Sequence, residues 1–291
     1  MIIDMKRNIT LLVLALCFFV PSMNATKRAL VIGVGAYPES TGWKAINGDK
    51  DIPVVTAMLN DNGFQSQDIV TLKNEQATCA RITSEMKSLV AKCSAGDFVF
   101  IHFSGHGQQI TDLDGDEDDG LDEAWVPYDA CLTYEKGKYE GQNHLLDDQL
   151  NVWLSQMRSK VGDKGKIVVV ADACHSGGST RAVGDEEEEG WVARGTSDTF
   201  IIPGQHTAYT GVSQQAGDWV LISACKSNET NYEYKGTGSL TYALSQLKGD
   251  LTNLTNKQIR IKAKGIICQI IPFNQNPQID CPDTRKDVTF F

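Results

Sequence analysis

The sequence has little positive charge, and this shortage narrows what the protein can bind. Its 291 residues include 27 lysines and arginines against 37 aspartates and glutamates, for a net charge of −10. Because phosphate-rich surfaces attract basic proteins, this balance argues against a nucleic acid or an anionic membrane as partner. An acidic protein suits basic substrates or divalent cations better.

Long apolar runs are also scarce, and only residues 9–20 form one. Lys6 and Arg7 precede this run, and small residues follow it up to Ala25. A basic start, a short apolar run and small residues predict a secretory signal peptide, residues 1–25, removed after Ala25. The run is short for a membrane span, so a retained membrane anchor is the weaker alternative. We therefore expect a secreted or periplasmic protein without a stable membrane span.

Disulfide pairing has little support in the sequence. Beyond the predicted signal, seven cysteines lie at positions 79, 93, 131, 174, 225, 268 and 281. An odd number leaves at least one thiol free. Cys79 and Cys93 end a predicted helix and would lie about 21 Å apart, which is too far to pair. The sequence therefore assigns no disulfide.

Buried strands and helices alternate along the chain, and no internal repeat is present. Continuous apolar runs predict strands at 28–37, 68–72, 97–107 and 218–225, and another that starts at Lys166. Amphipathic patterns predict helices at 51–64, 79–93, 147–160, 238–248 and 255–271. Strands without polar alternation, separated by helices, predict an α/β fold with a mostly parallel sheet covered on both faces. Functional sites of such folds form at the carboxyl ends of the strands.

One strand end carries a thiol. In KIVVVADACHSGG, residues 166–178, the apolar run stops at Asp172, and Cys174 follows before two glycines. A thiol becomes a nucleophile when a nearby base accepts its proton. The alternative for Cys174 is a buried structural thiol, but its place at a glycine-rich strand end favours catalysis.

The base must come from only five histidines, at positions 102, 106, 144, 175 and 206. His175 directly follows Cys174, and adjacent strand residues point to opposite faces. His102 lies inside an apolar strand and is expected to pack in the core. His106 lies just beyond that strand between two glycines, so we predict that His106 is the base and Cys174 the nucleophile.

HFSGHG followed by DACHSGG resembles the paired histidine and cysteine motifs of caspase-like cysteine peptidases, in particular the metacaspase and paracaspase branch. The likeness also includes INGDKDIPVVTAML, DEDDGLDEAWVPYD, LISACKSNETNYE and GSLTYAL, and it covers most of residues 27–270. The resemblance implies a three-layer α/β/α sandwich around a mostly parallel six-stranded sheet. The peptidase domain would span residues 26–291, with a large half at 26–178, a linker loop at 179–216 and a small half at 217–291.

The resemblance implies a peptide-bond hydrolase that works through an acyl-enzyme. His106 would be the general base and Cys174 the nucleophile, and the backbone N–H groups of Gly107 and Cys174 would form the oxyanion hole. This chemistry requires no cofactor. The implied partners are protein or peptide substrates, and metacaspases generally work as monomers.

Asp51 and Asp172 stand where metacaspase-like members place the acids of the pocket for the residue before the cut, and Ser104 would line the same pocket. Two desolvated carboxylates select arginine or lysine, because an uncharged side chain would leave them unpaired. Two observations complicate the assignment of Asp51. It is also a candidate N-cap of the following helix. In addition, GDKD departs from the family motif, which has a cysteine and an asparagine nearby.

An acidic loop extends from Asp112 to Glu123. Its spacing partly fits a calcium-binding loop, but Glu117 stands where the tight turn needs glycine, which argues against an EF-hand. The resemblance implies a different calcium site at Asp122, Asp147 and Asp148. A further acidic ligand expected shortly after the nucleophile is missing, because Arg181 stands there. We expect Ca²⁺ as an activator, and the alternative is a solvated acidic surface.

Arg181 and Arg194 lie in the linker loop, so an arginine-directed enzyme could cut its own chain at either. Three alternatives stay open beside the main hypothesis. The nearest is another arginine-directed peptidase of the gingipain or clostripain type. A second is a catalytically silent caspase-like domain that binds partners. The third, cleavage after aspartate, would need arginines near the two motifs, and none lies there.

Overall fold

The computed structural model describes residues 25–174, 191–204 and 217–291. The predicted signal peptide up to residue 24, His175, Arg181 and His206 lie outside this part of the chain. Within the described residues, no helix has the length and apolar character needed to cross a membrane.

A six-stranded sheet forms the centre of the molecule, with the strand order β11-β8-β7-β3-β1-β2. Its strands are β1 Lys27–Gly33, β2 Ile69–Lys73, β3 Phe98–Ser104, β7 Lys166–Asp172, β8 Val220–Ser223 and β11 Gln278–Asp280. All neighbours pair in parallel except β11, which is antiparallel to β8. The predicted six-stranded, mostly parallel sheet is confirmed.

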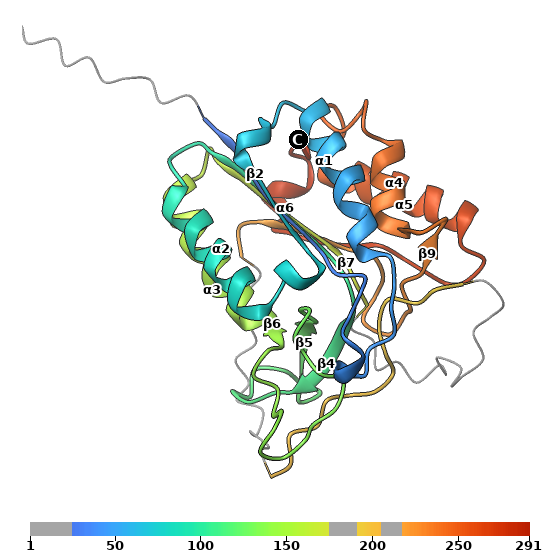
Figure 1. The fold of residues 1–291 in the computed structure, drawn as a ribbon. Coiled ribbons are helices and arrows are strands. Elements are labelled where there is room, and N and C mark those ends of the chain that lie inside the picture. The colour runs from blue at the N-terminus through green and yellow to red at the C-terminus, as the bar shows by residue number, and fades with distance from the viewer. Residues whose placement is uncertain (1–24, 175–190, 205–216) are drawn as a thin grey trace, which may run out of the picture.

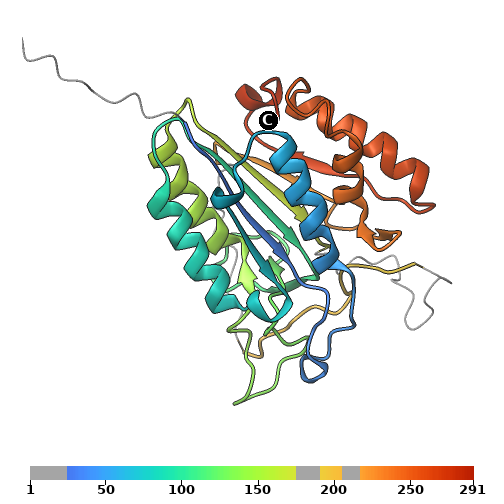
Figure 2. The same cartoon turned by 45° about the horizontal axis from the view of Figure 1, so that its top comes forward.

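Helices cover both faces of this sheet, so the three-layer sandwich is also confirmed (Figures 1 and 2). One face carries α2 Cys79–Lys92 and α3 Asp147–Val161, and the other carries α1 Asp51–Asp61, α4 Ser239–Gln246 and α5 Asn256–Ile270. The short α6 Asp283–Lys286 follows β11. Four 3-10 turns lie at Glu39–Thr41, Gly48–Lys50, Ser66–Asp68 and Asn74–Gln76.

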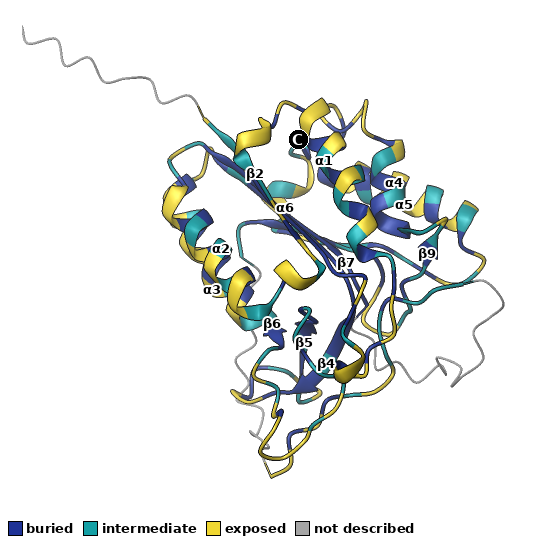
Figure 3. Cartoon of the chain, viewed as in Figure 1, coloured by how far each residue is buried: buried dark blue, intermediate teal, exposed yellow. Residues whose placement is uncertain are grey.

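The central strands are buried on both faces, which explains why their sequences lack polar alternation (Figure 3). Along β3, Val99, Ile101 and Phe103 belong to the apolar cluster under α2 and α3. Phe98 and Phe100 belong to the cluster under α1, α4 and α5. Successive side chains of one strand therefore hold both helical layers.

Short antiparallel strands, which the sequence patterns did not predict, lie at the carboxyl end of the sheet. β4 Gly107–Thr111, β5 Leu121–Trp125 and β6 Leu145–Leu146 form a three-stranded sheet, and β9 Glu233–Tyr234 pairs with β10 Thr237–Gly238. The acidic loop is therefore shorter than expected, because its last residues form β5. The strand expected at 97–107 is interrupted after Ser104, where the chain leaves the central sheet.

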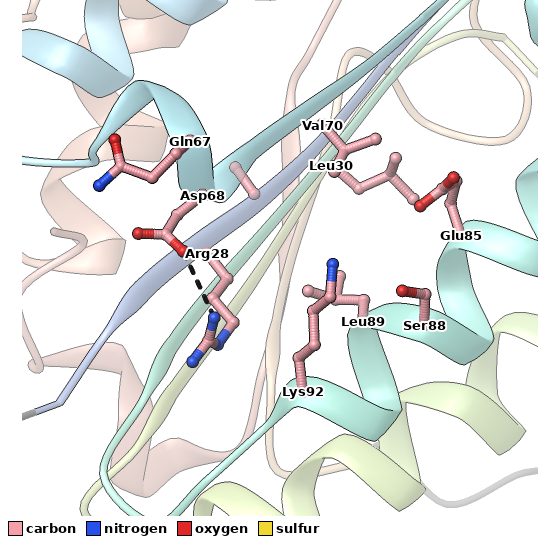
Figure 4. A pocket seen from close by; sticks show the side chains of 10 residues that line it. Arg28, Leu30, Gln67, Asp68, Val70, Glu85, Ser88, Leu89 and Lys92 are labelled. Atoms are coloured by element: carbon pink, nitrogen blue, oxygen red, sulfur yellow. Dashed lines mark hydrogen bonds and ion pairs between the residues drawn. The ribbon is translucent and has the colours of Figure 1, made fainter. Parts of the chain in front are cut away.

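A small hollow of about 30 Å³ lies at the opposite, amino-terminal end of β1 and β2. Figure 4 shows the ion pair between Arg28 and Asp68 beside it, with an N–O distance of 3.4 Å. A cavity of this size holds little more than one or two water molecules. The strands that carry the two predicted motifs end at the other, carboxyl end of the sheet.

Phe100 tests the packing of the core, because it is fully buried and its ring lies 5.6 Å from that of Phe291. Phe100→Ala is expected to lower the free energy of unfolding by about 3–5 kcal/mol, since it leaves a cavity between the sheet and its helices. Val152→Ala, at a position 56% exposed on α3, is the control and should change it by less than about 0.5 kcal/mol. Denaturant unfolding measures both, and similar effects of the two substitutions would contradict the packing described.

Candidate active site

The register between β3 and β7 brings the two predicted motifs to one edge of the sheet. Ser104 pairs with Asp172 across these parallel strands. His106 lies two residues beyond Ser104, and Cys174 lies two residues beyond Asp172. Segments almost 70 residues apart in the sequence therefore end side by side, as parallel strands require.

The ring of His106 is buried and fixed in orientation. Its Nε2 lies 2.9 Å from the carbonyl oxygen of Lys44, and the ring stacks on Trp43 with centroids 4.8 Å apart. Because a carbonyl only accepts, Nε2 carries the proton, and Nδ1, which has no hydrogen-bond partner among the described residues, carries the lone pair. Burial lowers the pKa of His106 to about 4. The imidazole is therefore neutral near pH 7 and has an available acceptor atom.

Cys174 is buried at the end of β7 and lies close to a second thiol. Its Sγ donates to the carbonyl oxygen of Glu229 at 2.9 Å, and Sγ of Cys225 donates to the same oxygen at 3.2 Å. The hydrogen bond to Cys174, together with burial, raises the pKa of Cys225 well above its ordinary value. None of the seven cysteines among the described residues is in a disulfide.

The three residues predicted for the acidic pocket lie together, and the guanidinium of Arg194 lies between them. Its Nη1 is 2.7 Å from Oδ2 of Asp51 and 3.7 Å from Oδ1 of Asp172, and it donates to the hydroxyl of Ser104. All four side chains are fully buried.

The alternative reading of Asp51 as a helix cap is wrong. Lys50 is the N-cap residue of α1, without a side-chain cap, and Asp51 is the first residue of the helix. The carboxylate of Asp51 instead accepts hydrogen bonds from Ser104, Arg194 and the backbone N–H of Gly238. The predicted core position of His102 agrees with its burial and its contact with Thr241 at 3.0 Å.

Glu233 is a third carboxylate of this pocket, and the sequence reasoning gave it no role. Its Oε1 lies 3.1 Å from Nε of Arg194 and accepts the backbone N–H of Asn47 at 2.6 Å. Asn231, two residues earlier, donates to Asp172 at 2.8 Å. Both residues lie in the SNETNYE stretch, so the segment carried a signal, but nothing in it identified which side chain reaches the pocket.

The charges around Arg194 do not cancel, since one guanidinium lies among three carboxylates. Burial opposes the charge of Arg194, but Asp51, Asp172 and Glu233 outweigh it and raise the pKa of Arg194 above its ordinary value. Burial also raises the pKa of Asp51 to about 6, despite the attraction of Arg194. The pocket is therefore an environment that stabilises a buried cation.

The backbone on both sides of Arg194 is also held in place. Its carbonyl oxygen accepts the N–H of Cys174 at 2.8 Å, and its own N–H donates to Asn231 at 2.9 Å. A Cβ on Gly195 would lie 2.6 Å from the carbonyl oxygen of Cys174, so only glycine fits there. The peptide bond between Arg194 and Gly195 therefore lies directly against Cys174.

Phe200 anchors the same segment farther along the chain. Its side chain is 1% exposed and contacts the rings of Tyr139 and His144. Its N–H donates to Gln109 at 2.8 Å, and its carbonyl oxygen accepts the N–H of Thr111 at 3.0 Å. The described part of the linker, residues 191–204, is thus fixed on β4 as well as in the pocket.

The other predicted site residues lie on β4 and in the acidic cluster beside β5 and α3. Gly107, predicted for the oxyanion hole, begins β4 opposite Trp125. The three predicted calcium ligands lie in three neighbouring carboxylate groups, each with oxygens within 4.8 Å of one another. These groups are Asp112, Asp116 and Asp122; Asp114, Asp116 and Asp148; and Glu117, Glu123 and Asp147.

The carboxylates of this acidic cluster repel one another. Burial and repulsion from Asp148 and Asp147 raise the pKa of Asp122 to about 8. Burial and repulsion from Glu123 raise the pKa of Asp147 to about 8. Asp116 is 9% exposed, and one of its carboxylate oxygens has no hydrogen-bond partner among the described residues.

Comparison with known proteins agrees with the fold and with the resemblance to caspase-like peptidases. The family model described as Caspase domain matches residues 26–289. The chain belongs to the caspase-domain cysteine peptidases. Metacaspase-1 of Mycosarcoma maydis is 25% identical over 301 residues, which cover 89% of this chain and 71% of that protein. Metacaspase-1B of Aspergillus fumigatus is 32% identical over 160 residues, which cover 52% of this chain and 35% of that protein.

A crystal structure of a protein from Geobacter sulfurreducens has the same fold, with a TM-score of 0.63 and 22% sequence identity. The match covers 90% of this chain and 96% of that chain. The metacaspase relatives place this caspase domain in the metacaspase branch, as the paired motifs suggested.

The ion pairs of Arg194 hold the linker segment in the caspase domain, and hydrogen exchange tests this. In a Cys174→Ala background, Arg194→Met is expected to speed exchange of the Arg194 and Glu233 amides by about a hundredfold or more, since three carboxylates lose their buried cation. Arg81→Met, which removes an exposed arginine of α2, is the matched control and should leave both amides unchanged. Unchanged exchange in Arg194→Met would contradict the role given to these ion pairs.

Proposed function

We propose that this caspase domain is a cysteine endopeptidase that cuts after arginine or lysine and processes its own chain between Arg194 and Gly195. One observation carries the proposal. The side chain of Arg194 occupies the acidic pocket while its carbonyl oxygen accepts the N–H of Cys174. A substrate residue before the cut would place its side chain and its carbonyl in these same positions.

The proposed reaction starts when the thiol of Cys174 turns from Glu229 and gives its proton to Nδ1 of His106. The thiolate attacks the carbonyl carbon of Arg194, and the N–H groups of Cys174 and Gly107 stabilise the negative oxygen that forms. His106 then gives the proton to the nitrogen of Gly195 as the peptide bond breaks. Water, activated by His106, hydrolyses the acyl-enzyme, and no cofactor takes part.

The charge of the pocket supports specificity for arginine and lysine over aspartate. Three buried carboxylates would repel an aspartate side chain, which argues against cleavage after aspartate. Arginine is expected to be preferred to lysine, because its planar group bonds to Asp51 and Glu233 through two different nitrogens. A gingipain-like or clostripain-like enzyme would share this preference.

Self-processing is tested by incubating the full chain and identifying the fragments by mass spectrometry. The wild-type chain is expected to yield a fragment that begins Gly195-Thr196-Ser197, whereas Cys174→Ala and Arg194→Gln stay intact at this bond. Arg181→Gln is the control, since it alters the other arginine proposed in the linker and leaves the cut after Arg194 in place. A wild-type chain that stays whole, or one cut equally in Cys174→Ala, would rule out the proposal.

Activity on other molecules should depend on release of Arg194, because the linker fills the pocket that a substrate needs. Arginyl reporter peptides are expected to be hydrolysed at least about tenfold faster after self-processing than before, with lysyl peptides slower and aspartyl peptides inert. Cys174→Ala controls for contaminating peptidases. Turnover of the aspartyl peptide alone would contradict the charge argument, and binding without turnover would favour the silent domain.

We also propose that the acidic cluster binds Ca²⁺ and that the cation activates the enzyme. Hard oxygen ligands, the unpartnered oxygen of Asp116 and the raised pKa values of Asp122 and Asp147 fit a divalent cation. Asp122, Asp147 and Asp148 would hold it, together with neighbouring carboxylates. When bound, the cation would neutralise their repulsion next to β5 and α3. The signal pattern at residues 1–25 supports export of the protein. We therefore expect a dissociation constant for Ca²⁺ of about 10⁻⁴–10⁻³ M, as in extracellular calcium sites.

The pH dependence of calcium binding tests this site. Because the folded pKa values of Asp122 and Asp147 lie near 8, above the usual 3.8, stability without metal is expected to fall as pH rises from about 4 to about 8. Binding releases these protons, so Ca²⁺ should raise the melting temperature more at pH 8 than at pH 6.

Asp122→Asn is expected to remove most of the difference between the effects of Ca²⁺ on the melting temperature at pH 8 and at pH 6. Asp61→Asn, at an exposed aspartate of α1 on the other face of the sheet, is the matched control and should keep it. Equal effects of Ca²⁺ at both pH values, or an unchanged response in Asp122→Asn, would contradict the calcium proposal.

A further inference from the structure

The linker segment that fills the acidic pocket carries an aromatic residue, Trp191, three positions before Arg194. The ring of Trp191 meets the ring of Phe273 edge to face, with centroids 5.8 Å apart. Phe273 in turn lies against Tyr232, with centroids 4.7 Å apart. Trp191, Tyr232 and Phe273 are all partly buried, and they pack against the same apolar cluster.

The backbone pairing explains why Trp191 reaches these rings. The carbonyl oxygen of Val192 accepts the N–H of Glu233 at 2.8 Å, and Ala193 lies opposite Tyr232 in an antiparallel bridge. In extended chain, alternate side chains share a face, so Trp191 and Ala193 lie on the same side of the segment. Arg194 is directed the other way, into the acidic pocket.

The two rings belong to the body of the domain and not to the linker. Tyr232 directly precedes β9, and Phe273 lies between α5 and β11. The buried side chain of Gln275 ties their segments together, since it accepts the N–H of Tyr232 at 3.2 Å and donates to the carbonyl oxygen of Ala224 at 3.1 Å. These contacts involve no linker residue, so the aromatic surface would persist after the linker leaves.

We propose that Tyr232 and Phe273 form a binding site for an aromatic side chain three residues before the cleaved arginine, in substrates as well as in the linker. The inference rests on the proposed peptidase function and adds to it a substrate class, peptides with the pattern aromatic, any residue, small residue, arginine. We expect a small residue directly before the arginine, because Ala193 occupies that position in the linker and lies opposite Tyr232.

Two reporter peptides test the site. Their sequences are Trp-Val-Ala-Arg and Ala-Val-Ala-Arg, and each carries a coumarin amide on the arginine. The processed wild-type enzyme is expected to show a kcat/KM about tenfold higher for the tryptophan peptide, since edge-to-face pairing and burial both contribute. The ratio of the two values is measured in one enzyme preparation, so it is independent of the folded fraction.

Phe273→Ala is expected to reduce this ratio to about two or less, and Phe273→Leu, which keeps apolar bulk, to an intermediate value. Tyr128→Ala, which removes a half-buried ring in the other apolar cluster, is the control and should keep the ratio of wild type. A wild-type ratio near one, or an unchanged ratio in both Phe273 variants, overturns the aromatic site. Failure of wild type to cleave either peptide, or its own chain, would instead overturn the peptidase function itself.

Discussion

The arrangement of the active site depends on one buried ion cluster, in which Arg194 lies between Asp51, Asp172 and Glu233. Taking a guanidinium out of water costs several kcal/mol, so the cluster is stable only because the carboxylates lie within ion-pair distance and are themselves hydrogen-bonded. These partners come from α1, the end of β7 and β9. The cluster therefore holds Arg194 against residues that precede it and follow it in the sequence, close to the thiol of Cys174.

The parallel sheet supplies the geometry that makes this cluster possible. Strands β3 and β7 are in register, so the residues that follow them, His106 and Cys174, lie at one edge. The same register puts Ser104 beside Asp172 on the floor of the pocket. The acidic pocket and the proposed catalytic pair are thus adjacent, because their residues follow one another at the ends of two neighbouring strands. Asn231 and Glu233 complete the pocket from the other side.

Much of the fold could be predicted from the sequence, because strands buried on both faces are continuous apolar runs and the helices have amphipathic patterns. The convergence of His106 with Cys174 and the placing of Asp51, Ser104 and Asp172 followed from strand ends and from the resemblance. The short strands β4, β5, β6, β9, β10 and β11 were not predicted, since segments of two to five residues, most of them of mixed polarity, carry too little pattern. The roles of Glu233 and Gln275 were missed because they depend on contacts between residues 39 and 51 positions apart.

The position of Arg194 in the acidic pocket could not be predicted either. In the sequence, Arg181 and Arg194 are equally good candidates for self-cleavage, because both lie in the predicted linker. Only the fold shows that the backbone pairing of Val192 and Arg194 with residues 231–233 delivers one of them to the pocket. A crystal structure of the intact Cys174→Ala chain tests this directly. We expect the guanidinium of Arg194 within hydrogen-bond distance of Asp51 and Glu233, and its carbonyl oxygen on the N–H of residue 174. An Arg194 in solvent, with the pocket open, would contradict the account.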